Sequence, residues 1–191
     1  KSLLKRLNFP LAIPSANISS AVSPTDCNDV VDEFGNKIKF ILDGGRSAIG
    51  LESTVIKLIG KIKIMRPGAI SEKEISKILN KKVTFTKPKK IKKVISPGLL
   101  KRHYSPGIPI KLNCKKNDDK AAFIVFGKKY NNNKNLFNLS KKNDLKEAAK
   151  NLYKIFRKIK KLKYKRIRVV KIPYSGIGIA INDRLKKASY K

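Results

Sequence analysis

Apolar and polar residues alternate in short blocks along this chain, and the period of the alternation differs from block to block. A helical period marks residues 24–34, 71–80, 144–163 and 177–188. Shorter apolar runs bounded by glycine, proline or asparagine predict strands at residues 11–13, 38–42, 53–59, 61–65, 108–112, 122–126 and 167–172. Strands that alternate with helices favour an α/β fold. The two runs that flank Gly60 predict a hairpin.

Capping residues support the first two long helices. Ser23 is a candidate N-cap, with Pro24 in the first helical position and Asp26 completing a capping box. Ser71 and Glu74 repeat the pattern in the next helix. We expect the buried face of that helix to consist of Ile75, Ile78 and Leu79.

The pattern changes between residues 81 and 107, where the apolar period fades, prolines recur and lysines cluster. This composition is typical of a linker. We therefore predict one domain over residues 1–82, an interdomain linker or lid over residues 83–109, and a second domain over residues 110–191. The chain starts at Lys1 without Met, inside what resembles the end of a helix over residues 2–7, so we expect it to be a fragment of a longer protein.

The net charge of +33 comes from 46 basic and 13 acidic residues. One source of this charge would be selection for an anionic partner such as RNA. The other is a compositional bias toward lysine, isoleucine and asparagine, which share A/T-rich codons. Eight of the basic residues are arginine, and nucleic-acid surfaces usually combine arginine with interleaved aromatic residues. We favour the compositional bias and leave direct tRNA binding open.

Few residues are available for metal or disulfide chemistry. Cys27, Cys114 and His103 are too isolated for a disulfide framework or a metal centre. No apolar run approaches the roughly 20 residues that span a bilayer, and no signal peptide opens the chain. We expect a cytoplasmic protein without a membrane partner or a metal ligand.

Short polar clusters lie at the edges of the predicted apolar segments, where a strand or helix ends and backbone groups are free to meet a ligand. They are residues 14–17 (PSAN), 23–25 (SPT), 42–45 (LDGG), 50–55 (GLESTV), 66–68 (RPG) and 101–106 (KRHYSP). Small hydroxyl residues, glycines and a fixed arginine suit a site for phosphates and a small polar substrate. This combination favours an enzyme over a basic domain without catalytic activity.

In their order along the chain, these clusters resemble the long, two-domain form of the YrdC-like L-threonylcarbamoyladenylate synthases. The segments that carry the resemblance are residues 12–17, 23–25, 43–45, 50–55, 65–70, 96–98 with 102–106, and 177–185. The resemblance implies the C-terminal part of a YrdC-like α/β sheet domain followed by a small Rossmann-like α/β domain. It also implies a nucleotidyltransferase that makes threonylcarbamoyl-AMP and pyrophosphate from L-threonine, bicarbonate and ATP.

The resemblance further assigns roles to residues that match the family's motifs. Residues expected to bind ATP are Ser15, Ser23, Arg66 and Tyr104; those expected to bind threonine are Ile13, through its backbone, and Ser53; Asn17, Gly44 and Gly45 would support the loops. No catalytic nucleophile is expected, and Mg²⁺ is expected on the ATP phosphates without an assigned protein ligand. The product would pass to downstream transferase machinery that modifies the adenosine next to the tRNA anticodon.

One departure from the family pattern leaves alternatives open. The family's phosphate motif and first threonine contacts lie before the position of Lys1, so we expect this chain alone to be inactive. A nonenzymatic basic RNA-binding module and a degenerate regulatory fragment are the alternative interpretations. Ser15 and Asn17 have a simpler alternative as residues that cap a turn.

Overall fold

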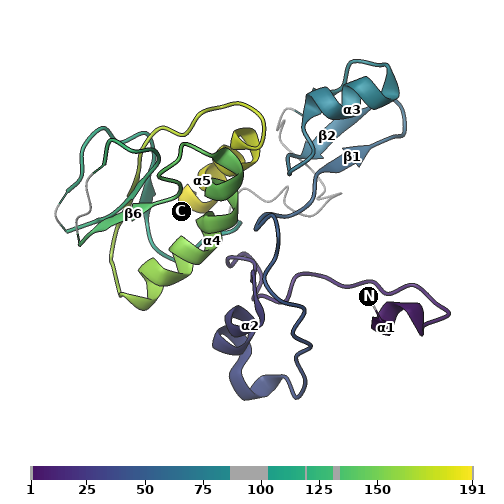
Figure 1. Ribbon diagram of the computed structural model, residues 1–191, viewed down its shortest axis with the longest axis horizontal. Helices are drawn as coiled ribbons and strands as arrows, with labels where there is room; N and C mark the ends of the chain where they lie inside the picture. Colours follow the sequence, from purple (N-terminus) through teal and green to yellow (C-terminus); the bar gives the residue numbers. More distant parts are fainter. Residues whose placement is uncertain (1, 87–102, 119, 131–133, 191) are drawn as a thin grey trace.

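The computed structural model describes residues 2–86, 103–118, 120–130 and 134–190 (Figure 1). The described residues form two parts, each with its own sheet and apolar core. We call residues 2–86 the first part, residues 108–190 the second part, and residues 103–107 the junction segment. Most of the predicted linker, including Lys101 and Arg102, lies outside the described residues. None of the helices in the described ranges is long and apolar enough to cross a membrane.

The first part contains a three-stranded sheet. Strands β1 (Val55–Lys57) and β2 (Lys63–Arg66) form the predicted antiparallel hairpin, and β3 (Thr84–Phe85) pairs with β2 in parallel. Helix α3 (Glu72–Leu79) connects β2 to β3. The sequence pattern did not predict β3, because its two residues are too few to show a period.

Helix α3 begins with the predicted capping box, in which Ser71 and Glu74 bond each other's backbone amides. It ends at Asn80, which adopts the left-handed conformation. The predicted buried face is wrong at Ile78, whose side chain is 81% exposed. Ile75 and Leu79 alone cover the narrow sheet, so the next position around the helix faces outward.

The remaining elements of the first part are α1 (Ser2–Lys5), α2 (Cys27–Phe34) and a short 3₁₀ helix, η1 (Gly35–Lys37). The predicted strands at residues 11–13 and 38–42 are absent, because neither segment has a neighbouring strand among the described residues. Phe40, in the second segment, is 89% exposed. The predicted N-cap of α2 is also wrong: Asp26 caps the helix, and Ser23 donates its hydroxyl hydrogen to Glu52 instead.

The second part contains a four-stranded parallel sheet with the order β4-β7-β5-β6. Its elements are β4 (Ile110–Lys111), β5 (Ala122–Val125), β6 (Leu136–Asn138), α4 (Leu145–Lys161), β7 (Ile167–Val169) and α5 (Gly178–Ser189). Helices α4 and α5 contact each other, and α4 lies between the sheet and α2 (Figure 1). Parallel strands joined through a helix confirm the predicted α/β class. The sequence pattern missed β6, which is short and follows an asparagine-rich stretch.

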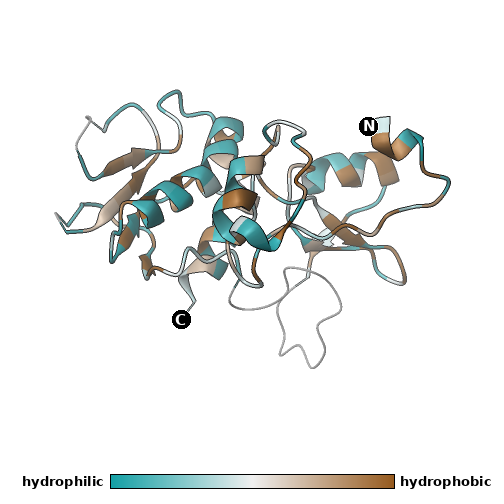
Figure 2. Ribbon diagram, turned by 90° about the horizontal axis from the view of Figure 1, so that it is seen from below, coloured by the Kyte–Doolittle hydropathy of each residue, from teal (hydrophilic) through white to brown (hydrophobic). Residues whose placement is uncertain are grey.

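Helix α4 contributes one apolar face to the core of the second part. Asp144 caps its first turn by accepting hydrogen bonds from the amides of Lys146 and Glu147. One face of the helix is fully buried and consists of Ala148, Ala149, Leu152, Tyr153, Phe156 and Ile159. Figure 2 shows hydrophilic residues on the outer side of α4 and mostly hydrophobic strands in the second part. The burial of this face in the core stabilises the second part.

A loop of the first part lies directly on α4. Arg46 donates a hydrogen bond of 3.4 Å to the carbonyl oxygen of Lys150. Gly50 has a φ of +77°, and a Cβ atom at this position would lie 2.7 Å from the Cα atom of Lys150. Only glycine allows the two backbones to approach this closely. Glu52 follows Gly50 by two positions, so the contact with α4 lies next to Glu52 along the chain.

We expect Gly50→Ala to destabilise the protein more than Gly60→Ala. Both substitutions place alanine at positive φ, which costs about 1 kcal/mol. A Cβ atom at Gly60 has no neighbour within 4 Å, whereas the one at Gly50 meets the backbone of α4, which adds about 1–3 kcal/mol. Urea unfolding of the two variants measures the difference directly. Equal losses would show that the loop can move away from α4 without cost.

Candidate functional site

The carboxylate of Glu52 lies where the two parts meet. Arg184 of α5, which is 0% exposed, donates from Nε to Oε2 of Glu52 at 2.8 Å. The hydroxyl of Tyr153, on α4, donates to the same carboxylate and lies 3.0 Å from each oxygen. The Ser23 hydroxyl donates to Oε1 at 2.6 Å. Both helices of the second part therefore hold one carboxylate of the first part.

Further groups surround the Arg184 guanidinium. Its Nη1 donates to Asp183 at 2.8 Å, and Lys187 pairs with the same aspartate at 2.7 Å. The guanidinium carbon lies 4.8 Å from the ring centre of Tyr104, a cation–π distance. The Tyr104 ring in turn stacks on Tyr153, with ring centres 6.2 Å apart. The guanidinium is thus enclosed by two carboxylates and an aromatic ring.

This arrangement shifts the acidity of several groups. Burial by itself raises the pKa of Glu52, but the Arg184 charge and the Ser23 hydroxyl outweigh burial and hold the pKa below its usual value. Burial and the neighbouring Glu52 carboxylate raise the pKa of Tyr153. Burial lowers the pKa of Lys187, although Asp183 opposes the change. Glu52 is therefore an ionised hydrogen-bond acceptor in the folded protein.

The junction segment passes through the same region. The amide of Ser105 donates to the carbonyl oxygen of Ser20 at 3.0 Å, and Tyr104 adopts a left-handed conformation with φ of 59°. Tyr104 is 1% exposed, and its hydroxyl group has no hydrogen-bond partner among the described residues. Burial also lowers the pKa of His103, which favours the neutral imidazole. The junction segment is therefore fixed by backbone pairing on the first part and by ring contacts on the second.

Ser53 and Arg66 lie at the neighbouring ends of β1 and β2. The Nε of Arg66 donates to the carbonyl oxygen of Ser53 at 3.0 Å, whereas the Ser53 side chain is exposed. The backbone of Gly68 packs so closely that a Cβ atom there would lie 2.2 Å from the amide nitrogen of Thr54. No carboxylate pairs with Arg66 within the described ranges of the chain. A half-buried arginine with an unneutralised charge therefore lies next to an exposed hydroxyl.

The structure brings together four of the residues assigned from the sequence: Ser23 and Ser53 flank Glu52, while Arg66 and Tyr104 lie beside them. Arg66 is near enough to Tyr104 to offset part of the increase that burial causes in the pKa of that tyrosine. Two of these four side chains are already engaged, because Ser23 donates to Glu52 and Tyr104 is buried. The hydroxyl of Ser53 is exposed, and Arg66 is half-buried without an ion-pair partner among the described residues.

The other assigned residues lie apart on exposed loops. Ile13, Ser15, Gly44 and Gly45 are all exposed. The amide of Gly45 is bonded to Asp43 at 2.8 Å, which closes a local turn. Asn17 donates to the carbonyl oxygens of Ile18 and Ala21, in agreement with the simpler interpretation as a turn cap.

Sequence reasoning gave no role to Glu52, Tyr153 or Arg184, although two of them lie within the quoted motifs. One signal was present for Arg184. It is an arginine in a lysine-rich chain, and it interrupts an apolar helical face formed by Ala180, Ile181, Leu185 and Ala188. A buried arginine needs a carboxylate partner, but nothing in the sequence indicated which one.

Comparisons with known proteins place both parts in the same group of proteins. A family model described as "Threonylcarbamoyl-AMP synthase, C-terminal domain" matches residues 70–189. A second model, described as "Telomere recombination" and covering YrdC-type sequences, matches residues 1–68. The domain limits predicted from the sequence stay a prediction.

Curated relatives agree with these matches. The threonylcarbamoyl-AMP synthase of Pyrococcus abyssi is 32% identical over 98% of this chain and 60% of its own length. The corresponding protein of Bacillus subtilis is 28% identical over 98% of this chain and 59% of its own length. This chain therefore spans about three fifths of the length of these relatives.

This chain is also similar in fold to solved structures. The crystal structure of P. abyssi Sua5 complexed with L-threonine superimposes with a TM-score of 0.78 at 30% identity, covering 92% of this chain and 56% of that one. A variant of the same protein, in which an adjacent histidine and tyrosine are replaced by alanine, superimposes with a TM-score of 0.77. These findings confirm the resemblance drawn from the motifs and the expected order of a partial YrdC-like domain and a second α/β domain.

The stability of the protein should depend on the ionisation of Glu52. The folded state lowers the pKa of Glu52 below its value in the unfolded chain, so its contribution to stability is fully present above the unfolded pKa and is lost as the pH falls through the folded pKa. Glu52→Gln leaves Arg184 buried without its partner and should lower the free energy of unfolding at neutral pH by about 3–5 kcal/mol. Urea unfolding from about pH 7 to about pH 3 should show a shallower decline in this variant than in the unmodified protein.

The control for this measurement is Glu72→Gln, which removes a carboxylate from the first turn of α3. This variant should retain the pH dependence of the unmodified protein. If the free energy of unfolding fell equally with pH in Glu52→Gln and in the unmodified protein, the charge of Glu52 would not be stabilising the folded state.

Proposed function

Because this chain belongs to the threonylcarbamoyl-AMP synthase family, we propose that it supplies part of the site that makes threonylcarbamoyl-AMP from ATP, L-threonine and bicarbonate. The two relatives compared above carry this activity in their names. Four of the residues that we assign to the site, Ser23, Ser53, Arg66 and Tyr104, lie around Glu52.

The observation that carries the proposal is the position of Arg66. The Ser53 carbonyl holds its Nε, and no carboxylate among the described residues neutralises its charge. A guanidinium fixed in this way can present its remaining N–H groups to phosphate oxygens through two parallel charged hydrogen bonds. We assign Arg66 to the ATP phosphates.

Ser53 is the candidate contact for L-threonine, because its exposed hydroxyl directly follows the fixed Glu52. The backbone of Ile13 would add a second contact, and P. abyssi Sua5 has been crystallised with L-threonine. Ser15 and Ser23 are assigned to ATP, with Asn17, Gly44 and Gly45 shaping the loops. Since the Ser23 proton is donated to Glu52, its oxygen could only accept a hydrogen bond from the ligand.

The chemistry requires positioning and charge neutralisation rather than a protein nucleophile. The amine of threonine and bicarbonate form a carbamate with loss of water. A carbamate oxygen then bonds to the α-phosphorus of ATP, and the bond between the α- and β-phosphates breaks to release pyrophosphate. A cationic group such as Arg66 would stabilise the charge on the phosphates as this bond breaks. The mixed anhydride is a substrate for an enzyme that transfers the threonylcarbamoyl group to a tRNA adenosine.

The described residues offer magnesium no preformed cluster of ligands. They include no group of three or more His, Cys, Asp or Glu side chains that could hold a metal ion. The Glu52 and Asp183 carboxylates are committed to Arg184 and Lys187. We therefore assign no protein ligand to Mg²⁺, which ATP would bring on its own phosphates.

We assign Tyr104 to the nucleotide as well, from the junction segment. Its ring is enclosed between Arg184 and Tyr153, so contact with the nucleotide would require the ring to leave this position. Such a movement would expose the buried hydroxyl of Tyr104.

Two substitutions test the substrate assignments. Arg66→Ala should weaken ATP binding by about 1.5–3 kcal/mol, because a charged hydrogen bond is lost, and should affect threonine little. Ser53→Ala should weaken L-threonine binding by about 1 kcal/mol and leave ATP binding nearly unchanged. Separate calorimetric titrations of each substrate measure both effects.

The matched controls are Arg166→Ala and Ser189→Ala, which remove an exposed arginine and an exposed hydroxyl elsewhere in the second part. Neither control should change the affinity for ATP or threonine. Equal losses for both substrates in both test variants, or losses that the controls reproduce, would contradict the assignments.

A further inference from the structure

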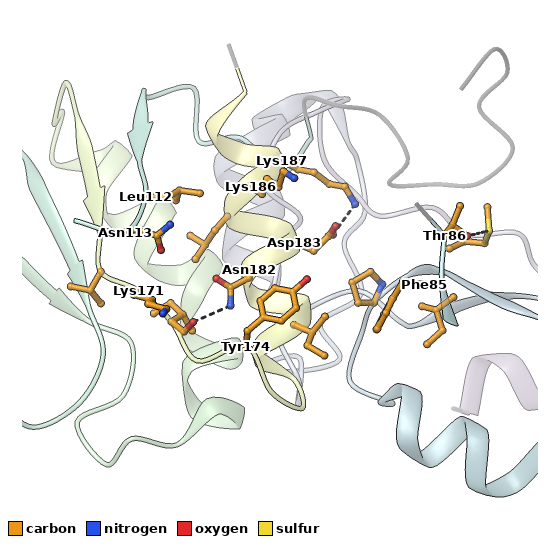
Figure 3. Close-up of a pocket in the computed structure, with 17 residues that line it drawn as sticks. Phe85, Thr86, Leu112, Asn113, Lys171, Tyr174, Asn182, Asp183, Lys186 and Lys187 are labelled. Carbon is orange, nitrogen blue, oxygen red and sulfur yellow. Dashed lines mark hydrogen bonds and ion pairs between the residues drawn. The ribbon is translucent and has the colours of Figure 1, made fainter. Parts of the chain in front are cut away.

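A cavity of about 800 Å³ lies between the two parts, on the side of α5 that faces β2 and β3 (Figure 3). The first part contributes residues around Met65 and Phe85, and the second part contributes the ends of β4 and β7 and one face of α5. This volume falls in the range of about 300–1,000 Å³ that is usual for small-molecule sites.

The position of the cavity in the second part favours ligand binding. Leu112 and Asn113 directly follow β4, and residues 170–172 directly follow β7, its neighbour in the parallel sheet. The carboxyl ends of parallel strands form the edge at which open α/β sheets bind ligands. The apolar floor there consists of Val170, Ile172 and Leu185, all of which are buried.

The charges that line the cavity are mostly positive. Lys171, Lys186 and Lys187 are cationic, and Asp183 is the one carboxylate among the lining residues. That carboxylate already pairs with Arg184 and Lys187. Lys171 and Lys186 have no ion-pair partner within the described ranges, so the cavity carries uncompensated positive charge suited to an anion.

Aromatic and amide side chains also line the cavity. Figure 3 shows the Tyr174 ring extending from the second part toward the strand that carries Phe85. Asn182 is held by the carbonyl oxygens of Ile172 and Gly178, so its amide is fixed at the wall, and Asn113 lies near the same wall. Aromatic rings and fixed amides suit a flat heterocycle with polar edges.

The cavity is separate from the residues assigned to catalysis. Met65 and Pro67 line it, but the intervening Arg66 does not, and neither do Ser15, Ser23, Ser53 or Tyr104. The Arg66 side chain is instead directed to the Ser53 carbonyl. A ligand in the cavity would therefore leave the Ser53–Arg66 surface free.

We propose that this cavity is a second ligand site, which binds a nucleoside monophosphate with its base between Tyr174 and Phe85 and its phosphate at Lys171 and Lys186. A phosphate group matches two separated ammonium groups better than a single carboxylate does, because it offers three acceptor oxygens and nearly two negative charges. The proposal does not depend on the synthase activity.

Calorimetric titration of the whole chain with AMP tests this site. Lys171→Gln and Lys186→Gln should each weaken AMP binding about tenfold, because each removes a charged contact to the phosphate. Tyr174→Ala should weaken both AMP and adenosine about threefold to tenfold through loss of stacking. Inorganic phosphate should compete with AMP, and adenosine should bind more weakly than AMP and be insensitive to the two lysine substitutions.

Two further variants distinguish binding in the cavity from diffuse surface attraction and from binding at the catalytic residues. Lys154→Gln removes one charge from the exposed side of α4 and should leave AMP binding unchanged. Arg66→Ala should also retain AMP binding at the cavity. An equal loss in Lys154→Gln would indicate diffuse attraction by the basic surface, and loss in Arg66→Ala without loss in Lys171→Gln would place AMP at the catalytic residues. Either result would overturn the proposal.

Discussion

The ion pair between Glu52 and Arg184 places two charges where little water can reach them. Removing such groups from water costs several kcal/mol for each ion, and the attraction between them compensates only when further hydrogen bonds complete the site. Here Tyr153, Ser23 and Asp183 supply these bonds, and the Tyr104 ring covers the guanidinium. If either charge is removed, the other is left buried without a partner. A substitution that removes only one of the two charges should therefore cost more stability than the lost attraction alone, because it also leaves a buried charge unpaired.

This contact also determines the geometry of the candidate site. Glu52 immediately precedes Ser53, and the Ser53 carbonyl holds Arg66, so the second part fixes the position of both groups through one carboxylate. Arginine suits this task because its planar group makes several directed hydrogen bonds at once. Arg157 makes a similar contact between α4 and α2, where it pairs with Glu33 at 3.0 Å. Lys161 of α4 adds a more exposed ion pair to the same helix through Asp32.

Local signals in the sequence predicted local structure well. The Ser71–Glu74 capping box and the apolar face of α4 gave both helices, because each is determined by residues a few positions apart. The strand predicted at residues 38–42 failed because an apolar run forms a strand only beside a partner, and the described residues provide none. The motif resemblance led to the assignment of Ser53 and Arg66, but it gave no indication of the Glu52–Arg184 pair beside them. Glu52 and Arg184 are 132 positions apart, and no local pattern connects residues at that distance.

A double-mutant cycle on Glu52 and Arg184 tests most directly whether their pairing joins the two parts. It compares the unfolding free energies of the unmodified protein, Glu52→Gln, Arg184→Met and the double variant in urea at neutral pH. If the buried pair stabilises the assembly as described, the double variant should be less destabilised than the sum of the single variants by about 2 kcal/mol or more. Losses that add within about 0.5 kcal/mol would show that the two side chains act independently and would contradict this account.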